Sequence, residues 1–146
     1  MKRMLLAAAV LALAACNPYI EQQSVAPPGR SARLDEVRGF WGLQHYRLEL
    51  SEGVALALTC HHGAPCEKVK VLSDDPAIAE VRPASLAALQ TRGFGGDGVP
   101  ASAFVVIGKA PGKTTLRLTA KEGHREVVVT VIAPPAKPNE QTAASD

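Results

Sequence analysis

The sequence predicts an all-β fold, an antiparallel sandwich of about seven short strands. Between residues 104 and 132, apolar and polar side chains alternate with a period of two, most clearly in 116–120 and 127–131. Such alternation is typical of a strand that buries one face. Upstream, further short runs of this kind are separated by turn residues, with no long helical pattern between them. Strands at this spacing favour a sandwich or barrel.

The strands are expected in the following order. Residues 44–50 alternate apolar and polar side chains, and Ser51-Glu52-Gly53 turns the chain into a second strand at 54–59. Strands at 68–72 and 78–82 follow, and Pro83 ends the latter because it lacks a backbone N–H. The region 104–132 supplies three more strands. These are separated by the turns GKAPGK and KEG.

Residues 84–101 interrupt this pattern and are expected to leave the sheet. Their first part, 85–90, is compatible with one or two helical turns, and their second part reads TRGFGGDGVP. The excursion is expected at one end of the sandwich.

The N-terminus has the features of an export signal. Lys2 and Arg3 precede an apolar run, 4–15, that is too short for a membrane span. The run ends in Leu-Ala-Ala-Cys16, which resembles the bacterial lipoprotein cleavage box, in which the cysteine is acylated and residues 1–15 are removed. The alternative is an ordinary signal peptide that leaves Cys16 free. Asn17, in place of an aspartate, resembles lipoproteins sorted to the outer membrane of a Gram-negative bacterium.

Composition defines one small domain of neutral charge. Removing residues 1–15 takes away two of the 16 basic side chains and leaves 14 against 14 acidic ones. A neutral surface does not attract nucleic acid, so none is expected as a partner. The proline-containing segment 16–38 is expected to be a flexible tether behind the lipid, 39–133 the sandwich, and 134–146 a disordered tail.

Two segments resemble the recurrent segments of bacterial immunoglobulin-like domains of group 2 type. They are 73–81, SDDPAIAEV, and 108–116, GKAPGKTTL. The N-terminal domain of pilus-assembly and secretin proteins has a similar pair. The resemblance covers about 43–132 and implies an immunoglobulin-like sandwich that serves as an interaction or spacer module. It carries over no catalytic residue.

Two glycine-rich runs approach phosphate-binding motifs without the required context. Residues 93–98 satisfy GxGxxG, but Pro100 and a strand follow where a helix is needed. Residues 108–114 have three residues between their glycines instead of four, and a strand follows them too. Both are interpreted as turns, and no nucleotide is expected.

One local group of residues could form a covalent bond or bind a metal: Cys60-His61-His62-Gly63-Ala64-Pro65-Cys66. In an exported protein, two nearby cysteines favour a disulfide, and the intervening Gly and Pro allow the loop to turn back. The alternative is a metal-binding or redox-responsive site, because two thiolates and two imidazoles form a sufficient zinc or copper set.

Aromatic side chains mark a second candidate site. Phe40 and Trp41 stand with Tyr46 at the entry to the domain, and Phe94 lies in the glycine-rich excursion. They are expected either to close one end of the core or to bind an envelope protein or glycan.

No combination of nucleophile, base and oxyanion site is recognisable, so the sequence does not predict an enzyme. It predicts a cell-envelope lipoprotein whose only prosthetic group is the covalent lipid on Cys16. A metal-binding or redox-responsive lipoprotein and an accessory of a pilus or secretion machine are the alternatives.

Overall fold

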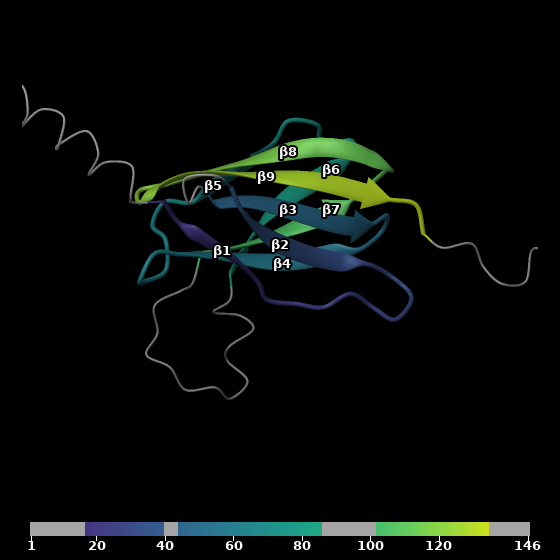
Figure 1. Ribbon diagram of the computed structural model, residues 1–146, viewed down its shortest axis with the longest axis horizontal. Helices are drawn as coiled ribbons and strands as arrows, with labels where there is room; N and C mark the ends of the chain where they lie inside the picture. Colours follow the sequence, from purple (N-terminus) through teal and green to yellow (C-terminus); the bar gives the residue numbers. More distant parts are fainter. Residues whose placement is uncertain (1–16, 40–43, 86–101, 135–146) are drawn as a thin grey trace, which may run out of the picture.

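The computed structural model describes residues 17–39, 44–85 and 102–134, and it confirms the all-β prediction (Figure 1). The described residues form nine strands in two sheets and contain no helix. The four-stranded sheet has the order β1 (Tyr19–Gln22), β4 (Ala55–His61), β7 (Ser102–Gly108), β6 (Ala79–Ser85). The five-stranded sheet has the order β2 (Ala32–Arg38), β3 (Gln44–Ser51), β9 (Gly123–Ile132), β8 (Gly112–Ala120), β5 (Lys70–Ser73).

The strand order is that of an immunoglobulin-type sandwich with an addition. If β1 is strand A, the four-stranded sheet has the order A-B-E-D, and β9, β8 and β5 form the G-F-C edge of the other sheet. The strands β2 and β3 extend that sheet beyond G. The pair β3–β9 is parallel, so the expectation of a wholly antiparallel sandwich was wrong at this one ladder.

The core lies between the sheets and follows from the period-two pattern. In β8, Thr114, Leu116 and Leu118 are buried while Lys113 and Arg117 are exposed, because successive side chains point to opposite faces of a strand. The two sheets interdigitate through such positions. The buried apolar residues are Ile20, Tyr46, Leu48, Leu50, Val54, Leu56, Leu58, Cys60, Cys66, Ala79, Phe104, Val106, Leu116, Leu118, Val127, Val129 and Val131.

The structure corrects the interpretation of 16–38 as a flexible tether, because this segment supplies two strands. The strand β1 pairs with β4, so that Ile20 lies opposite Cys60 and is buried in the core. The strand β2 pairs with β3 over its whole length. The side-chain amide of Gln22 joins the two new strands, since its Nε2 donates to Ala32 O at 3.1 Å and its Oε1 accepts from Leu34 N at 2.9 Å.

Two expected strand boundaries also shift. The strand β6 continues through Pro83 to Ser85 because it is an edge strand, where a missing N–H can face away from the neighbour. The strand β5 begins at Lys70 rather than Lys68, whose φ of 53° takes it out of the strand. Of the helical turns expected at 85–90, Ser85 belongs to β6 instead, and 86–90 lie outside the described residues.

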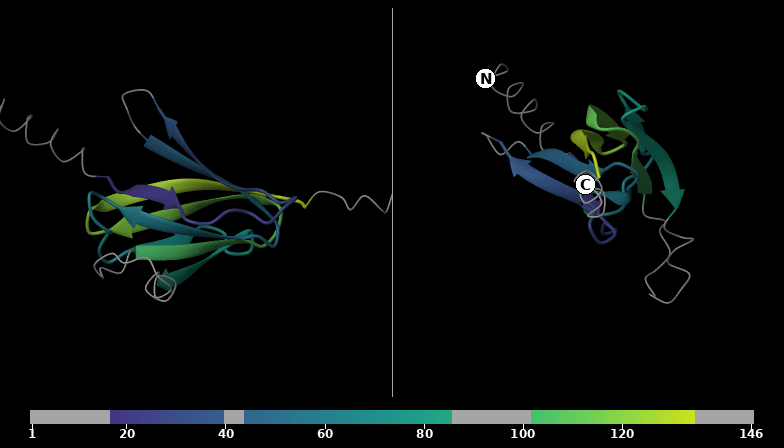
Figure 2. Two further views of the ribbon diagram at one scale, coloured as in Figure 1. Left: turned by 90° about the horizontal axis from the view of Figure 1, so that it is seen from below. Right: turned by 90° about the vertical axis from the view of Figure 1, so that its right-hand side faces the viewer.

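The chain enters and leaves the sandwich at opposite ends (Figure 1). We call one end the disulfide end; it contains residues 17–18, the starts of β3 and β9, the loop 61–69 and the turn 121–122. We call the other end the distal end; it contains the turns 52–54, 74–78 and 109–111 and the residues after β9. Figure 2 shows the outer part of the β2–β3 pair diverging from the sandwich near the disulfide end.

Gly108 closes the distal end and carries the first prediction. Its carbonyl accepts from Gly53 N at 2.8 Å, and a Cβ built on it would lie 2.9 Å from the Ser51 carbonyl oxygen. Because backbone atoms cannot yield cheaply, we expect Gly108→Ala to lower the free energy of unfolding by about 1–3 kcal/mol. Urea unfolding of this variant beside Lys109→Ala, a change at an exposed side chain, measures the effect. Equal midpoints for the two variants would contradict this packing.

Candidate functional site

The Cys60–Cys66 disulfide is present and closes the loop that follows β4. The two Cα atoms lie 5.4 Å apart, and both half-cystines are buried. Cys66 N donates to Cys60 O at 3.0 Å, and the Ser102 hydroxyl donates to Cys66 O. The predicted disulfide is thus confirmed, and the Ser102 hydrogen bond joins its loop to the start of β7.

The histidines of this loop stack on β1 instead of converging on the sulfurs. The ring of Tyr19 lies 5.6 Å from that of His61 and 6.4 Å from that of His62. His61 Nε2 is 3.0 Å from Glu21 Oε1, within ion-pair distance but outside hydrogen-bond geometry.

The four-ligand metal hypothesis, built on the two cysteines and two histidines of this loop, is not supported. The disulfide consumes both sulfurs, which cannot be thiolate ligands while it is intact. In the described ranges, no group of three or more His, Cys, Asp or Glu side chains could hold a metal ion.

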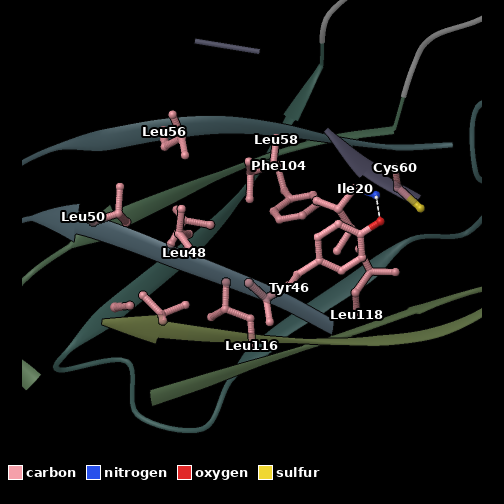
Figure 3. Packing of buried hydrophobic residues seen from close by; sticks show 14 of the residues in the cluster. Ile20, Tyr46, Leu48, Leu50, Leu56, Leu58, Cys60, Phe104, Leu116 and Leu118 are labelled. Atoms are coloured by element: carbon pink, nitrogen blue, oxygen red, sulfur yellow. Dashed lines mark hydrogen bonds between the residues drawn. The ribbon is translucent and has the colours of Figure 1, made fainter. Parts of the chain in front are cut away.

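Tyr46 belongs to the core, which corrects its assignment to a partner-binding patch. Its side chain is 2% exposed, and its hydroxyl accepts a hydrogen bond from Ile20 N at 3.4 Å (Figure 3). The guanidinium of Arg125 lies 5.8 Å from the centre of its ring. Tyr46 therefore joins β3 to β1 and is part of the core at the disulfide end.

Burial raises the pKa of the Tyr46 phenol above its ordinary value. Above about pH 10 the unfolded chain loses this proton while the folded chain keeps it, so stability should fall as pH rises. We expect Tyr46→Phe to weaken that alkaline loss. Urea unfolding of the wild type and of this variant between about pH 8 and 11 measures it. Parallel pH profiles for the two proteins would contradict the buried phenol.

A polar cavity of about 300 Å³ opens beside the first described residue. It lies where β3 and β9 begin as parallel neighbours. Arg125 is one of its lining residues, and its guanidinium is held on the inner face of β9 by three hydrogen bonds: Nε donates to Pro18 O at 2.7 Å, Nη1 to Gln44 O at 3.1 Å and Nη2 to Gln44 Oε1 at 3.0 Å. The lining residues are Asn17, Gln44, His45, His124, Arg125 and Glu126.

The outer faces of the two sheets differ in composition. On the five-stranded sheet, the outward positions of β2, β3 and β8 are largely charged, as the exposed side chains of Arg33, Arg47, Glu49, Lys113 and Arg117 show. Leu72 of β5 and Val128 of β9 are exposed apolar side chains on the same face. Such a face is well solvated and typical of a sheet with one wet side.

The outward face of the four-stranded sheet is apolar at its centre. We call this surface the apolar face, and it consists of small or β-branched side chains on β4, β7 and β6. Register places Ala57 beside Val105 and Ala55 beside Ile107. The apolar face comprises Ala55, Ala57, Ala84, Ala103, Val105 and Ile107. Of its members, Ala55 is exposed and the others are half-buried.

Charged side chains rim the apolar face on its β6 side. Glu80 Oε1 is 2.7 Å from Arg82 Nε, and Glu80 Oε2 is 3.5 Å from Lys109 Nζ. The hydrogen bond from Arg82 holds the pKa of the Glu80 carboxyl below its ordinary value. The other side of the face is bounded by Tyr19 and by the Glu21–His61 pair.

The remaining predicted site residues, Cys16, Phe40, Trp41 and Phe94, lie outside the described residues. Arg125 and the apolar face were missed. Arg125 carried no signal, because its partners are 81 and 107 residues away in the chain. The apolar face did carry one: in 103–107, AFVVI, the pattern is apolar at every position, which indicates a strand with apolar side chains on both faces.

Within the parts that the structure describes, no helix has the length and apolarity needed to cross a membrane.

No protein-family model matches this chain, and no curated protein matches it. Among solved structures, it is similar to domains 4 and 5 of the S-layer protein SbsC, with 19% identity, a TM-score of 0.40 and coverage of 80% of this chain and 54% of that one. Another structure, of domains 1–6 of the surface layer protein SbsC, gives 20% identity, a TM-score of 0.42 and coverage of 84% and 14%. The chain thus spans about half of the first structure. Similarity at this level does not show a function for this chain.

Proposed function

We propose that this protein is a non-enzymatic interaction module of the bacterial cell envelope, held on a membrane by lipid on Cys16. The observation that supports it best is the apolar face. The outer face of the five-stranded sheet is mostly polar, with Leu72 and Val128 as exposed exceptions, while the four-stranded sheet turns Ala57, Val105 and their neighbours outward. A partner protein with a flat apolar surface would bury this face.

The geometry of the chain ends suits a module that is displayed from a surface. The anchor-bearing N-terminus meets the disulfide end, and the chain leaves at the distal end (Figure 1). A domain held by one end leaves its sides accessible, and the apolar face is on a side. The sequence features of export and acylation agree with this placement.

The partner's contact site is tested by photo-crosslinking in cells that make the protein. A benzophenone amino acid placed at Val105 should yield a crosslinked adduct with another envelope protein. The same probe at Thr115, which points outward from the five-stranded sheet, is the matched control and should yield none. Equal adducts at both positions, or none at Val105, would count against the apolar face.

A charge placed in the middle of the apolar face gives a second readout. We expect Val105→Lys to abolish co-purification of the partner while Val128→Lys, on the opposite outer face, retains it, because an apolar interface cannot accommodate an unpaired ammonium. Both positions are at least partly exposed, so both variants should fold. Retention of the partner by Val105→Lys would refute this contact.

A further inference from the structure

The chain next to Cys16 is fixed to the sandwich, and this determines how an anchored domain is oriented. Pro18 is fully buried, and its carbonyl accepts from Arg125 Nε at 2.7 Å. The strand β1 begins at the next residue, Tyr19, which pairs with His61. Only Asn17 separates Cys16 from this fixed backbone. Because one residue spans at most about 3.6 Å, the anchor has a reach of only about 7 Å from Pro18.

A lipid on Cys16 would therefore bring the disulfide end to the bilayer surface. This end carries all four histidines of the chain, at 45, 61, 62 and 124. Lys121 and Glu67 form an ion pair at this end, at 2.9 Å. The polar cavity lies at the same end, and Asn17 forms part of its wall.

The cavity offers the groups that a zwitterionic headgroup requires. The side chain of Arg125 points to the inner face of β9, where it donates to Pro18 and Gln44. His45 and His124 point to the outer face, and their ring N–H groups are donors that suit a phosphodiester anion. Glu126 supplies one carboxylate in the same lining, which suits an ammonium group.

We propose that the disulfide end stands directly on the membrane and that the outward side chains of His45, His124 and Glu126, which line the cavity, bind the phosphate and ammonium of a phospholipid headgroup. The inference rests on the acylation of Cys16 that the proposed function includes. Arg125 fixes the chain that leads to the anchor, through its bond to Pro18 O.

Hydrogen exchange of the full-length protein, purified with its lipid and inserted into phosphatidylethanolamine-containing nanodiscs, tests the orientation. Relative to a soluble Cys16→Ser form, amides in 61–68 and 119–125 should exchange about tenfold more slowly on the disc. Amides of the distal end, in 73–79 and 108–113, are the internal control and should be unchanged. Equal exchange at both ends, or protection at the distal end, would overturn the orientation.

The headgroup contact is tested with His45→Gln/His124→Gln, a double variant that leaves the Arg125 bonds intact. We expect this variant to lose most of the protection of 119–125 on the disc, while Lys113→Gln/Arg117→Gln retains it. Protection that is identical in both variants would overturn the headgroup site.

Inorganic phosphate added to the soluble Cys16→Ser form separates a lipid from a free anion. It should leave exchange of 119–125 unchanged, and protection by phosphate alone would overturn the assignment to lipid. Mass spectrometry of the same sample keeps the two proposals apart. A sample without acyl groups on Cys16 contradicts the proposed anchor, whereas an acylated sample without protection contradicts only the orientation.

Discussion

Leu118→Ala should destabilise the sandwich by about 2–5 kcal/mol, the usual cost of removing a buried leucine side chain. Leu118 lies in β8 and is 1% exposed. Its neighbour across the ladder is Val71 of β5, which packs against the same core. Truncation there leaves a cavity that two rigid sheets cannot close.

The adjacent strand offers a matched control for this change. Leu72 follows Val71 in β5 but points to the other face and is 70% exposed. We expect Leu72→Ala to change the free energy of unfolding by less than about 0.5 kcal/mol. Urea unfolding of both variants measures the difference. Comparable losses would show that the two leucines do not face opposite sides of β5 and β8, and so contradict the assigned register.

Loss of the Cys60–Cys66 bridge should lower the free energy of unfolding by about 2 kcal/mol. The bridge restricts the unfolded chain by closing a loop between two cysteines that are 6 residues apart in the sequence. Both half-cystines are buried, so a Cys60→Ala/Cys66→Ala variant also loses packing. The loss should be larger than for an exposed bridge of the same length.

Reduction separates the bridge itself from the packing of its sulfur atoms. In a soluble Cys16→Ser form, a reducing agent should shift the urea midpoint of the wild-type loop downward and leave that of the double alanine variant unchanged. An unchanged midpoint, with both thiols shown to be free by mass spectrometry, would mean that the bridge contributes nothing to stability.

The C-terminal part of the fold could be predicted because each strand there carries its own pattern. In β8 and β9, apolar residues such as Leu116 and Val129 alternate with polar ones, and glycine turns separate the strands. Burial of one face is enough to fix such strands. The disulfide was predictable for a different reason, since two close cysteines in an exported chain oxidise.

The N-terminal strands could not be predicted because their pattern is weak. The strand β1 has four residues with a single buried apolar side chain, that of Ile20. The strand β2 is an edge strand in which Leu34 and Val37, both only partly buried, are three positions apart and so lie on opposite faces. Their place is set by pairing with distant strands and by the Gln22 amide, contacts that no local pattern contains.

The polar cavity was likewise beyond sequence reasoning. Gln44 and Arg125 are far apart in the chain, and they meet only because β3 and β9 pair in parallel. The same pairing places His45 and His124 at one end of the molecule. The sequence predicted a flexible tether, and the structure replaces it with a chain fixed by Arg125 and Tyr46. That change makes the orientation on a membrane a testable property.

The most direct test of the proposed lipid anchor is the mass of the protein extracted from the membrane fraction of cells that make it. We expect a chain that begins at Cys16, lacks residues 1–15 and carries acyl groups on that cysteine, with two further mass units missing for the Cys60–Cys66 bridge. A Cys16→Ser variant should leave the membrane fraction. A chain that begins elsewhere, or one with an unmodified Cys16 thiol, would contradict the account.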